Sequence, residues 1–112
     1  MFAVLFLSLV TSGWAQARAH PVSQSQLDAG RRAYMAVCIQ CHNKDPNKKG
    51  SLGPELTDAP LEIMQYKVAH GTYPTTLPTG YIPKRKTKAM RKLPNSVKDV
   101  ANIHAWIQSV KK

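Results

Sequence analysis

The chain has 112 residues, with 16 Lys and Arg against 6 Asp and Glu, and carries a formal net charge of +10 at neutral pH. A chain of this length forms at most one small domain, which excludes the large multidomain enzymes. The strong positive charge favours association with anionic surfaces and gives little information about the fold.

The first residues predict an export signal. Residues 1–10 are a short apolar run, and two small-x-small cleavage sequences follow it, ending at Ala17 and Ala19. The run is shorter than the roughly 20 apolar residues that span a bilayer. We therefore expect residues 1–19 to be a signal peptide and residues 20–112 to be one periplasmic domain with no membrane span. An uncleaved membrane anchor is the alternative, and export argues against a nucleic-acid partner.

Residues 25–40 are predicted to form a helix. Ser25 and Asp28 fit a capping box at its start. Residues at spacings of three and four then form one stripe: Leu27, Gly30, Tyr34, Val37, Cys38 and Cys41. Glycine inside a helix costs about 1 kcal/mol against Ala. A glycine on the buried face therefore indicates that another helix crosses closely at Gly30.

The predicted helix ends at Cys38-Ile39-Gln40-Cys41-His42, on which the functional interpretation depends. A Cys-x-x-Cys-His run is typical of c-type haem attachment, in which two thiols form thioethers and the imidazole binds the iron. A zinc site would need two more nitrogen or sulfur ligands, and the other histidines are isolated. A redox-active pair would sit at a helix N-terminus, not at the C-terminal end. A disulfide would close only a very short loop. The motif thus predicts one covalently attached haem c per chain.

Two more helices are expected after the motif. Asp58 and Pro60 predict the start of the second and Gly71 its end, with Leu61, Met64 and Val68 on one face. Residues 72–95 contain four prolines and no clear periodicity, which indicates a long loop. Ser96 and Asp99 then fit a capping box before apolar residues at helical spacing: Val100, Ile103, Trp106, Ile107 and Val110. No strand is expected, so the predicted fold class is all-α.

These features resemble the class I c-type cytochromes of the bacterial monohaem type, over nearly all of residues 20–112. Cys38-x-x-Cys41-His42 matches their attachment motif, and Gly53-Pro54-x-Leu56 matches their Gly-Pro-x-Leu segment. The resemblance implies a small cytochrome c fold, in which three or more helices wrap around the haem with a long Pro-rich ligand loop. It also implies that the Pro54 carbonyl accepts a hydrogen bond from His42 and that Leu56 packs on the haem. The family's crossing of first and last helices is matched by Gly30, Tyr34 and Trp106.

The second axial ligand is the main open choice. The resemblance implies Met90, which ends the long loop where the family carries its ligand. In many bacterial members a Pro follows this Met, whereas Arg91-Lys92 follows it here, and a Trp at the usual haem-propionate position is missing. The other axial candidates are Met35, Met64, His70 and His104. The candidate propionate contacts are Tyr66, Tyr73, Tyr81 and Arg85.

The resemblance implies a periplasmic carrier that moves single electrons between redox partners, because His and Met ligation suits electron transfer. The alternative is a haem c subunit or domain of a periplasmic oxidoreductase complex, acting for example on sulfur compounds or peroxide. No acid–base cluster lies near Cys41, so no catalytic residue is predicted. The basic run from Lys84 to Lys92 flanks Met90 and is either a solvated loop or a docking rim. As a rim it would attract acidic faces of partners such as a terminal oxidase or a dehydrogenase. We expect a monomer.

Overall fold

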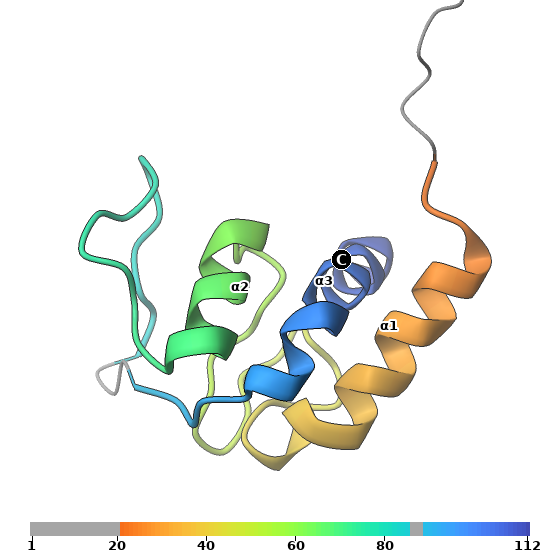
Figure 1. The fold of residues 1–112 in the computed structure, drawn as a ribbon, viewed down its shortest axis with the longest axis horizontal. Helices are drawn as coiled ribbons and strands as arrows, with labels where there is room; N and C mark the ends of the chain where they lie inside the picture. Colours follow the sequence, from red (N-terminus) through yellow and green to blue (C-terminus); the bar gives the residue numbers. More distant parts are fainter. Residues whose placement is uncertain (1–20, 86–88) are drawn as a thin grey trace, which may run out of the picture.

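The computed structural model describes residues 21–85 and 89–112. The predicted signal peptide, residues 1–19, lies outside the described residues, as do Lys86 and Lys88 of the basic run. The described part contains helices and no strand, which confirms the all-α prediction for this part of the chain. Its elements are α1 (Gln24–Val37), η1 (Cys38–Gln40), α2 (Leu61–His70), η2 (Pro94–Asp99) and α3 (Val100–Val110), where η denotes a 3₁₀-helix (Figure 1). None of these described helices has the length and apolar character needed to cross a membrane.

The start of α1 differs from the prediction. Ser23 is the N-cap, two residues before the predicted Ser25, and it forms a capping box with Gln26. The Ser23 N–H donates to the Gln26 side-chain oxygen at 2.9 Å, and the Gln26 N–H donates to the Ser23 hydroxyl at 3.2 Å. Asp28 instead accepts a hydrogen bond from the Gln24 side chain at 2.9 Å. Ser23-x-x-Gln26 has Gln at the third helical position, where Gln or Glu is preferred, so it displaces the Ser25-x-x-Asp28 pattern.

α1 and α3 cross in close contact, as the buried glycine predicted. A Cβ on Gly30 would overlap the backbone carbonyl of Asn102 in α3, so only a hydrogen fits between the helices. One turn further along α1, Tyr34 is fully buried, and its ring packs on Trp106 with centroids 5.1 Å apart. The Tyr34 hydroxyl donates a hydrogen bond to the Asn43 carbonyl. The crossing therefore also fixes the chain directly after the Cys-x-x-Cys-His motif.

The predicted caps of the other two helices are wrong. Pro60, not Asp58, is the N-cap of α2, and the Asp58 carboxylate binds Lys84 and Lys111 instead. Ser96 does not cap α3 because it lies inside η2, which leads directly into that helix. The predicted end of α2 is correct. Gly71 adopts a left-handed conformation with φ 76°, and its N–H donates to the Lys67 carbonyl at 2.7 Å.

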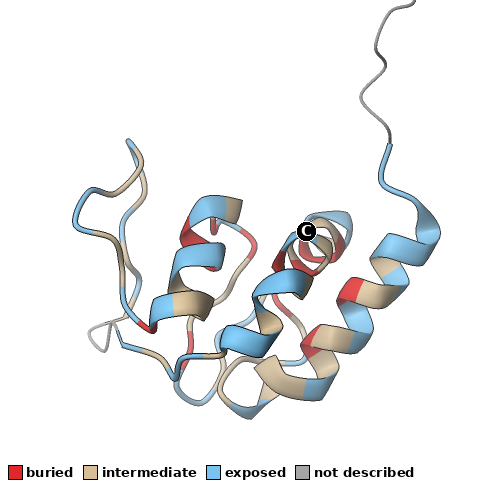
Figure 2. Ribbon diagram, viewed as in Figure 1, coloured by how far each residue is buried: buried red, intermediate tan, exposed pale blue. Residues whose placement is uncertain are grey.

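Most of the buried residues of the helices lie on the faces that α1, α2 and α3 turn toward the interior (Figure 2). α3 packs against both α1 and α2, and η2 packs against α2 (Figure 1). The buried core cluster consists of Tyr34, Ala59, Met64, Val100, Ile103, Trp106 and Ile107. This core holds the C-terminal end of α1, and with it Cys38, against the rest of the domain.

The close crossing at Gly30 determines whether Gly30→Ala raises or lowers the free energy of unfolding. Helix propensity alone predicts that Gly30→Ala stabilises the protein by about 1 kcal/mol. We expect a loss of about 1–3 kcal/mol in the free energy of unfolding instead, because the new methyl group meets backbone that cannot rotate away. Denaturant unfolding followed by helical circular dichroism measures the difference. A Gly30→Ala protein more stable than the wild type would contradict the close crossing.

Candidate functional site

A cavity of about 410 Å³ lies between the C-terminal end of α1, one face of α2, the start of α3 and the loops on either side of α2. Its size is within the range of small-molecule sites. All seven residues predicted for the site line it: Cys38, Cys41, His42, Gly53, Pro54, Leu56 and Met90. The fold thus brings together residues that come from three separate segments of the sequence.

The two cysteines lie at the end of α1 and just after η1. Cys38 is the C-cap residue of α1, and its N–H donates to the Tyr34 carbonyl. Both sulfurs are free thiols, and both residues are partly buried. Burial raises the pKa of the Cys38 thiol to about 11, so this thiol is neutral at physiological pH. A neutral thiol at a helix C-terminus is poorly suited to thiol–disulfide exchange, which disfavours the redox-pair alternative.

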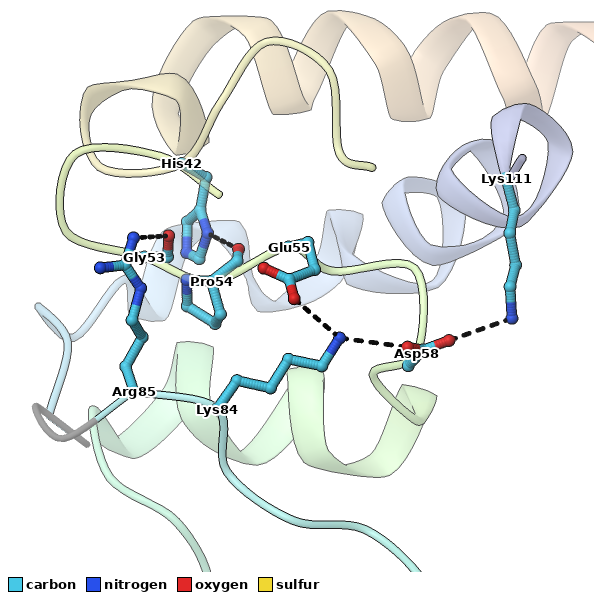
Figure 3. A network of polar contacts seen from close by, with 8 residues as sticks. All are labelled: His42, Gly53, Pro54, Glu55, Asp58, Lys84, Arg85 and Lys111. Carbon is cyan, nitrogen blue, oxygen red and sulfur yellow. Dashed lines mark hydrogen bonds and ion pairs between the residues drawn. The ribbon is translucent and has the colours of Figure 1, made fainter. Parts of the chain in front are cut away.

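His42 is held in one orientation by the loop in front of α2. Its Nδ1 lies 3.0 Å from the Pro54 carbonyl oxygen, which can only accept a hydrogen bond (Figure 3). In the neutral ring, Nδ1 therefore carries the proton and Nε2 has the free lone pair. Burial lowers the pKa of His42, the bond to Pro54 opposes this, and the charges of Lys67 and Arg85 lower the pKa further. A neutral imidazole with a free Nε2 is the state in which His binds a metal.

Gly53 gives His42 the space that this orientation needs. A Cβ at residue 53 would overlap the imidazole ring of His42. The loop is folded back on the motif, because the Leu52 and Gly53 N–H groups donate to the Cys41 carbonyl at 3.2 and 2.9 Å. Gly53 therefore lies against the His42 ring, while the Pro54 carbonyl accepts the hydrogen bond from Nδ1. The sequence identified both residues only through the family resemblance, and the structure supplies their physical role.

Arg85 forms part of a polar side of the cavity. Its Nη2 donates to the Gly50 carbonyl at 2.7 Å and to the Gly53 carbonyl at 3.3 Å, the second of which is drawn in Figure 3. Its Nε is buried and has no hydrogen-bond partner among the described residues. Buried polar groups are nearly always paired, so a donor left over in a cavity wall suits an acceptor on a ligand.

The other polar side chains that line the cavity include Lys67, Tyr73 and Tyr81. The Lys67 ammonium lies 4.0 Å from the centre of the Tyr73 ring, and the Tyr73 and Tyr81 rings are 6.1 Å apart. Of the four candidates for propionate contact, Tyr66 does not line the cavity. Lys67 was missed in the sequence, although its spacing of three from Met64 places the two on neighbouring parts of one helix face.

The candidates for a second axial ligand are reduced to two thioethers. Met90 and Met64 both line the cavity, whereas Met35, His70 and His104 do not. Met64 is buried on α2, as expected of a residue that fills the core. Met90 is partly buried and belongs to the loop that returns to η2. Both methionine sulfurs therefore remain candidates for the second axial ligand.

The basic run does not present all of its charges to solvent. Arg85 is turned inward, and Lys84 forms ion pairs with Glu55 and Asp58, both at 3.1 Å (Figure 3). Asp58 also pairs with Lys111 at 3.2 Å. The run contributes two further exposed cations in the described part of the chain, Arg91 and Lys92. Within the described residues, fewer cations of the basic run are therefore available to a docking partner than the sequence predicts.

Comparisons with protein-family models, with curated proteins and with solved structures found no match to this chain. Within residues 21–85 and 89–112, no three His, Cys, Asp or Glu side chains gather as a metal site would require. The zinc alternative therefore finds no further ligands there. The case for a function rests on the motif and on the cavity around it.

Proposed function

We propose that this chain is a periplasmic monohaem electron carrier of the class I cytochrome c type, with His42 and Met90 as axial ligands. One observation carries the proposal. Both thiols, an imidazole fixed by a backbone carbonyl and a thioether from a distant loop all line one cavity with mostly apolar walls. A thiol pair, an imidazole and a thioether together suit a covalently attached haem and suit neither zinc nor a simple disulfide.

The remaining residues of the cavity also fit a haem. Apolar side chains from α2, α3 and the loops supply walls for a large flat ring, among them Leu56, Ile63, Val68, Val100 and Ile103. A haem also carries two acidic propionate groups, which need hydrogen-bond donors or cations. The unpartnered Nε of Arg85 and the ammonium of Lys67 can supply these. We propose that this polar side receives the haem propionates, with Tyr73 and Tyr81 beside it.

When bound, a haem supplies an iron that can gain or lose one electron. The work of the chain is to hold that iron and to control its surroundings. His42 and Met90 would hold the iron from the two segments that line the cavity, and no coordination position would then be left for a substrate. Pro54 keeps the proton on Nδ1 of His42 and makes the ring a stronger ligand. The apolar walls exclude water, and a Met ligand raises the reduction potential. This arrangement favours a carrier over an enzyme.

The exposed cations beside Met90 give the carrier a positive edge. Arg91 and Lys92 directly follow the proposed ligand, and Arg91 also lines the mouth of the cavity. Positive charge near the exposed edge of a redox group speeds encounter with acidic partners. We propose that acidic faces of redox proteins dock here.

The proposal is tested on protein matured in a periplasm with c-type haem attachment. A pyridine haemochrome assay is expected to detect one covalently attached haem per chain. Absorption spectra are expected to show six-coordinate, low-spin iron in both oxidation states, with carbon monoxide binding only slowly. Absence of covalent haem would contradict the proposal outright. Rapid carbon monoxide binding by the native protein would support the oxidoreductase-subunit alternative, because it reveals an open axial position.

The axial ligand is assigned by a pair of variants. Met90→Ala is expected to lose the charge-transfer band between the thioether and ferric iron and to lower the reduction potential, because the ligand is removed. Met64→Ala is expected to keep the band, although it loses stability by about 2–5 kcal/mol because Met64 is buried. The reverse pattern would make Met64 the ligand.

The docking edge is tested with ferricyanide, an anionic oxidant of defined charge. Arg91→Glu with Lys92→Glu is expected to slow oxidation of the ferrous protein about tenfold at low ionic strength. The control is Arg31→Glu with Arg32→Glu, which changes the net charge equally on α1, away from the cavity lining. At about 1 M salt the Debye length is only about 3 Å, so both variants should approach the wild-type rate. Equal slowing by the two pairs would contradict a local docking edge.

A further inference from the structure

We infer that Gly71, the C-cap of α2, is the positioning residue that sets the place of Met90 in the cavity. The inference deepens the proposed function and rests on it only where Met90 is called the iron ligand. Residues 90–93, here called the strap, make a set of backbone contacts with the end of α2.

The strap is hydrogen-bonded to the last turn of α2. The Met90 N–H donates to the Gly71 carbonyl at 2.8 Å, and the Leu93 N–H donates to the Val68 carbonyl at 2.8 Å. The last carbonyls of a helix have no partner within the helix, so they are available for such bonds. Two bonds at the two ends of the strap fix its distance from α2. Met90, Leu93 and Val68 all line the cavity, so the strap and the helix end form one continuous part of its wall.

Gly71 also contacts Met90 from a second side. A Cβ built on Gly71 would lie 2.5 Å from the Met90 carbonyl oxygen, whereas an ordinary contact begins near 3.4 Å. The neighbour is backbone, so it cannot rotate away as a side chain would. Gly71 has φ 76°, which an L-residue with a side chain rarely adopts. A hydrogen at this position is therefore required for both the end of α2 and the approach of Met90.

These contacts with Gly71 determine how far the Met90 thioether extends into the cavity. The backbone of Met90 is held by the Gly71 carbonyl and limited by the Gly71 α-carbon, so the side chain starts from a fixed point. Metal–ligand distances in established sites fall within about 0.2 Å of their standard values, so the position of a ligand side chain is narrowly defined. A Cβ at residue 71 would lie 2.5 Å from the Met90 carbonyl oxygen, so the Met90 backbone would have to shift to make room. If a haem is bound, the end of α2, and not the long loop alone, would determine where the Met90 sulfur is held.

The chain contains a matched control for this effect. Gly80 also has a left-handed conformation, with φ 83°, but nothing lies within 4 Å of the Cβ that Ala would add there. Gly71→Ala and Gly80→Ala therefore impose the same kind of backbone strain, and only the first pushes on Met90. Asn tolerates a left-handed conformation better than Ala. Gly71→Asn thus relieves the strain at the helix end while keeping the contact with Met90.

The experiment compares the matured full-length proteins by the thioether–ferric charge-transfer band, by imidazole binding and by amide hydrogen exchange. Gly71→Ala and Gly71→Asn are expected to weaken the band and to bind imidazole about tenfold more tightly, because the axial position is open for more of the time. They are also expected to speed exchange of the Met90 amide. Gly80→Ala is expected to match the wild type in all three measurements. Circular dichroism checks that each variant retains its helices.

The outcomes separate this inference from the proposed function. If both Gly71 variants keep wild-type Met90 exchange and imidazole binding, Gly71 does not position Met90. If Gly80→Ala has the same effects as Gly71→Ala, backbone strain and not the contact is responsible, and the inference is also wrong. If the wild type lacks the band but the Met90 amide loses protection only in the Gly71 variants, the positioning role stands and the ligand assignment fails. The wild-type exchange rate needs no variant, so rapid exchange of its Met90 amide would overturn the inference even if the Gly71 variants do not fold.

Discussion

The contact between Gly30 and the backbone of Asn102 is the constraint on which the rest of the structure depends. Because α1 and α3 meet backbone to backbone there, Tyr34 is buried one turn later and packs on Trp106. The hydroxyl of the same tyrosine then reaches past the end of α1 to the Asn43 carbonyl. A contact between two helices is thus transmitted to the segment that carries Cys38, Cys41 and His42. Crossing, core and motif are parts of one packing arrangement.

The opposite wall of the cavity has few regular elements and is held in another way. There, polar contacts between residues 84–85 and residues 50–58 hold the loops together in place of helix packing. Arg85 donates to carbonyls of the loop behind His42, and Lys84 pairs with two carboxylates just before α2. These exposed ion pairs contribute little individually, since solvent screens them. The hydrogen bonds of Arg85 are partly buried and connect the segment approaching Met90 to the loop that orients His42.

The helical core can be predicted from the sequence because the spacing of apolar residues along a helix depends only on neighbouring residues. The stripe of α1 as far as Val37, the buried Gly30 and the glycine at the end of α2 are confirmed, whereas Cys38 and Cys41 lie beyond α1, because the predicted helix 25–40 becomes a 3₁₀-helix at Cys38. The caps were less predictable, because Ser23 and Ser25 both begin an acceptable pattern and only the better third residue, Gln26, decides between them. Asp58 resembled a cap in sequence, but its cationic partners Lys84 and Lys111 come from distant parts of the chain. The choice of Met90 over Met64 rests on the family resemblance alone, because both residues line the cavity and the loop before Met90 has no periodicity.

The network around Asp58 has a consequence for the order in which the domain can form. Asp58 binds Lys84 and Lys111, and Asn47 donates to the Val110 carbonyl and accepts from the Lys112 N–H. The end of α3 is therefore attached both to the loop after the motif and to the turn before α2. Such contacts join residues far apart in sequence, which slows folding relative to local helix pairing. The loops that carry Asn47 and Asp58 therefore gain these contacts only once the end of α3 has docked against them.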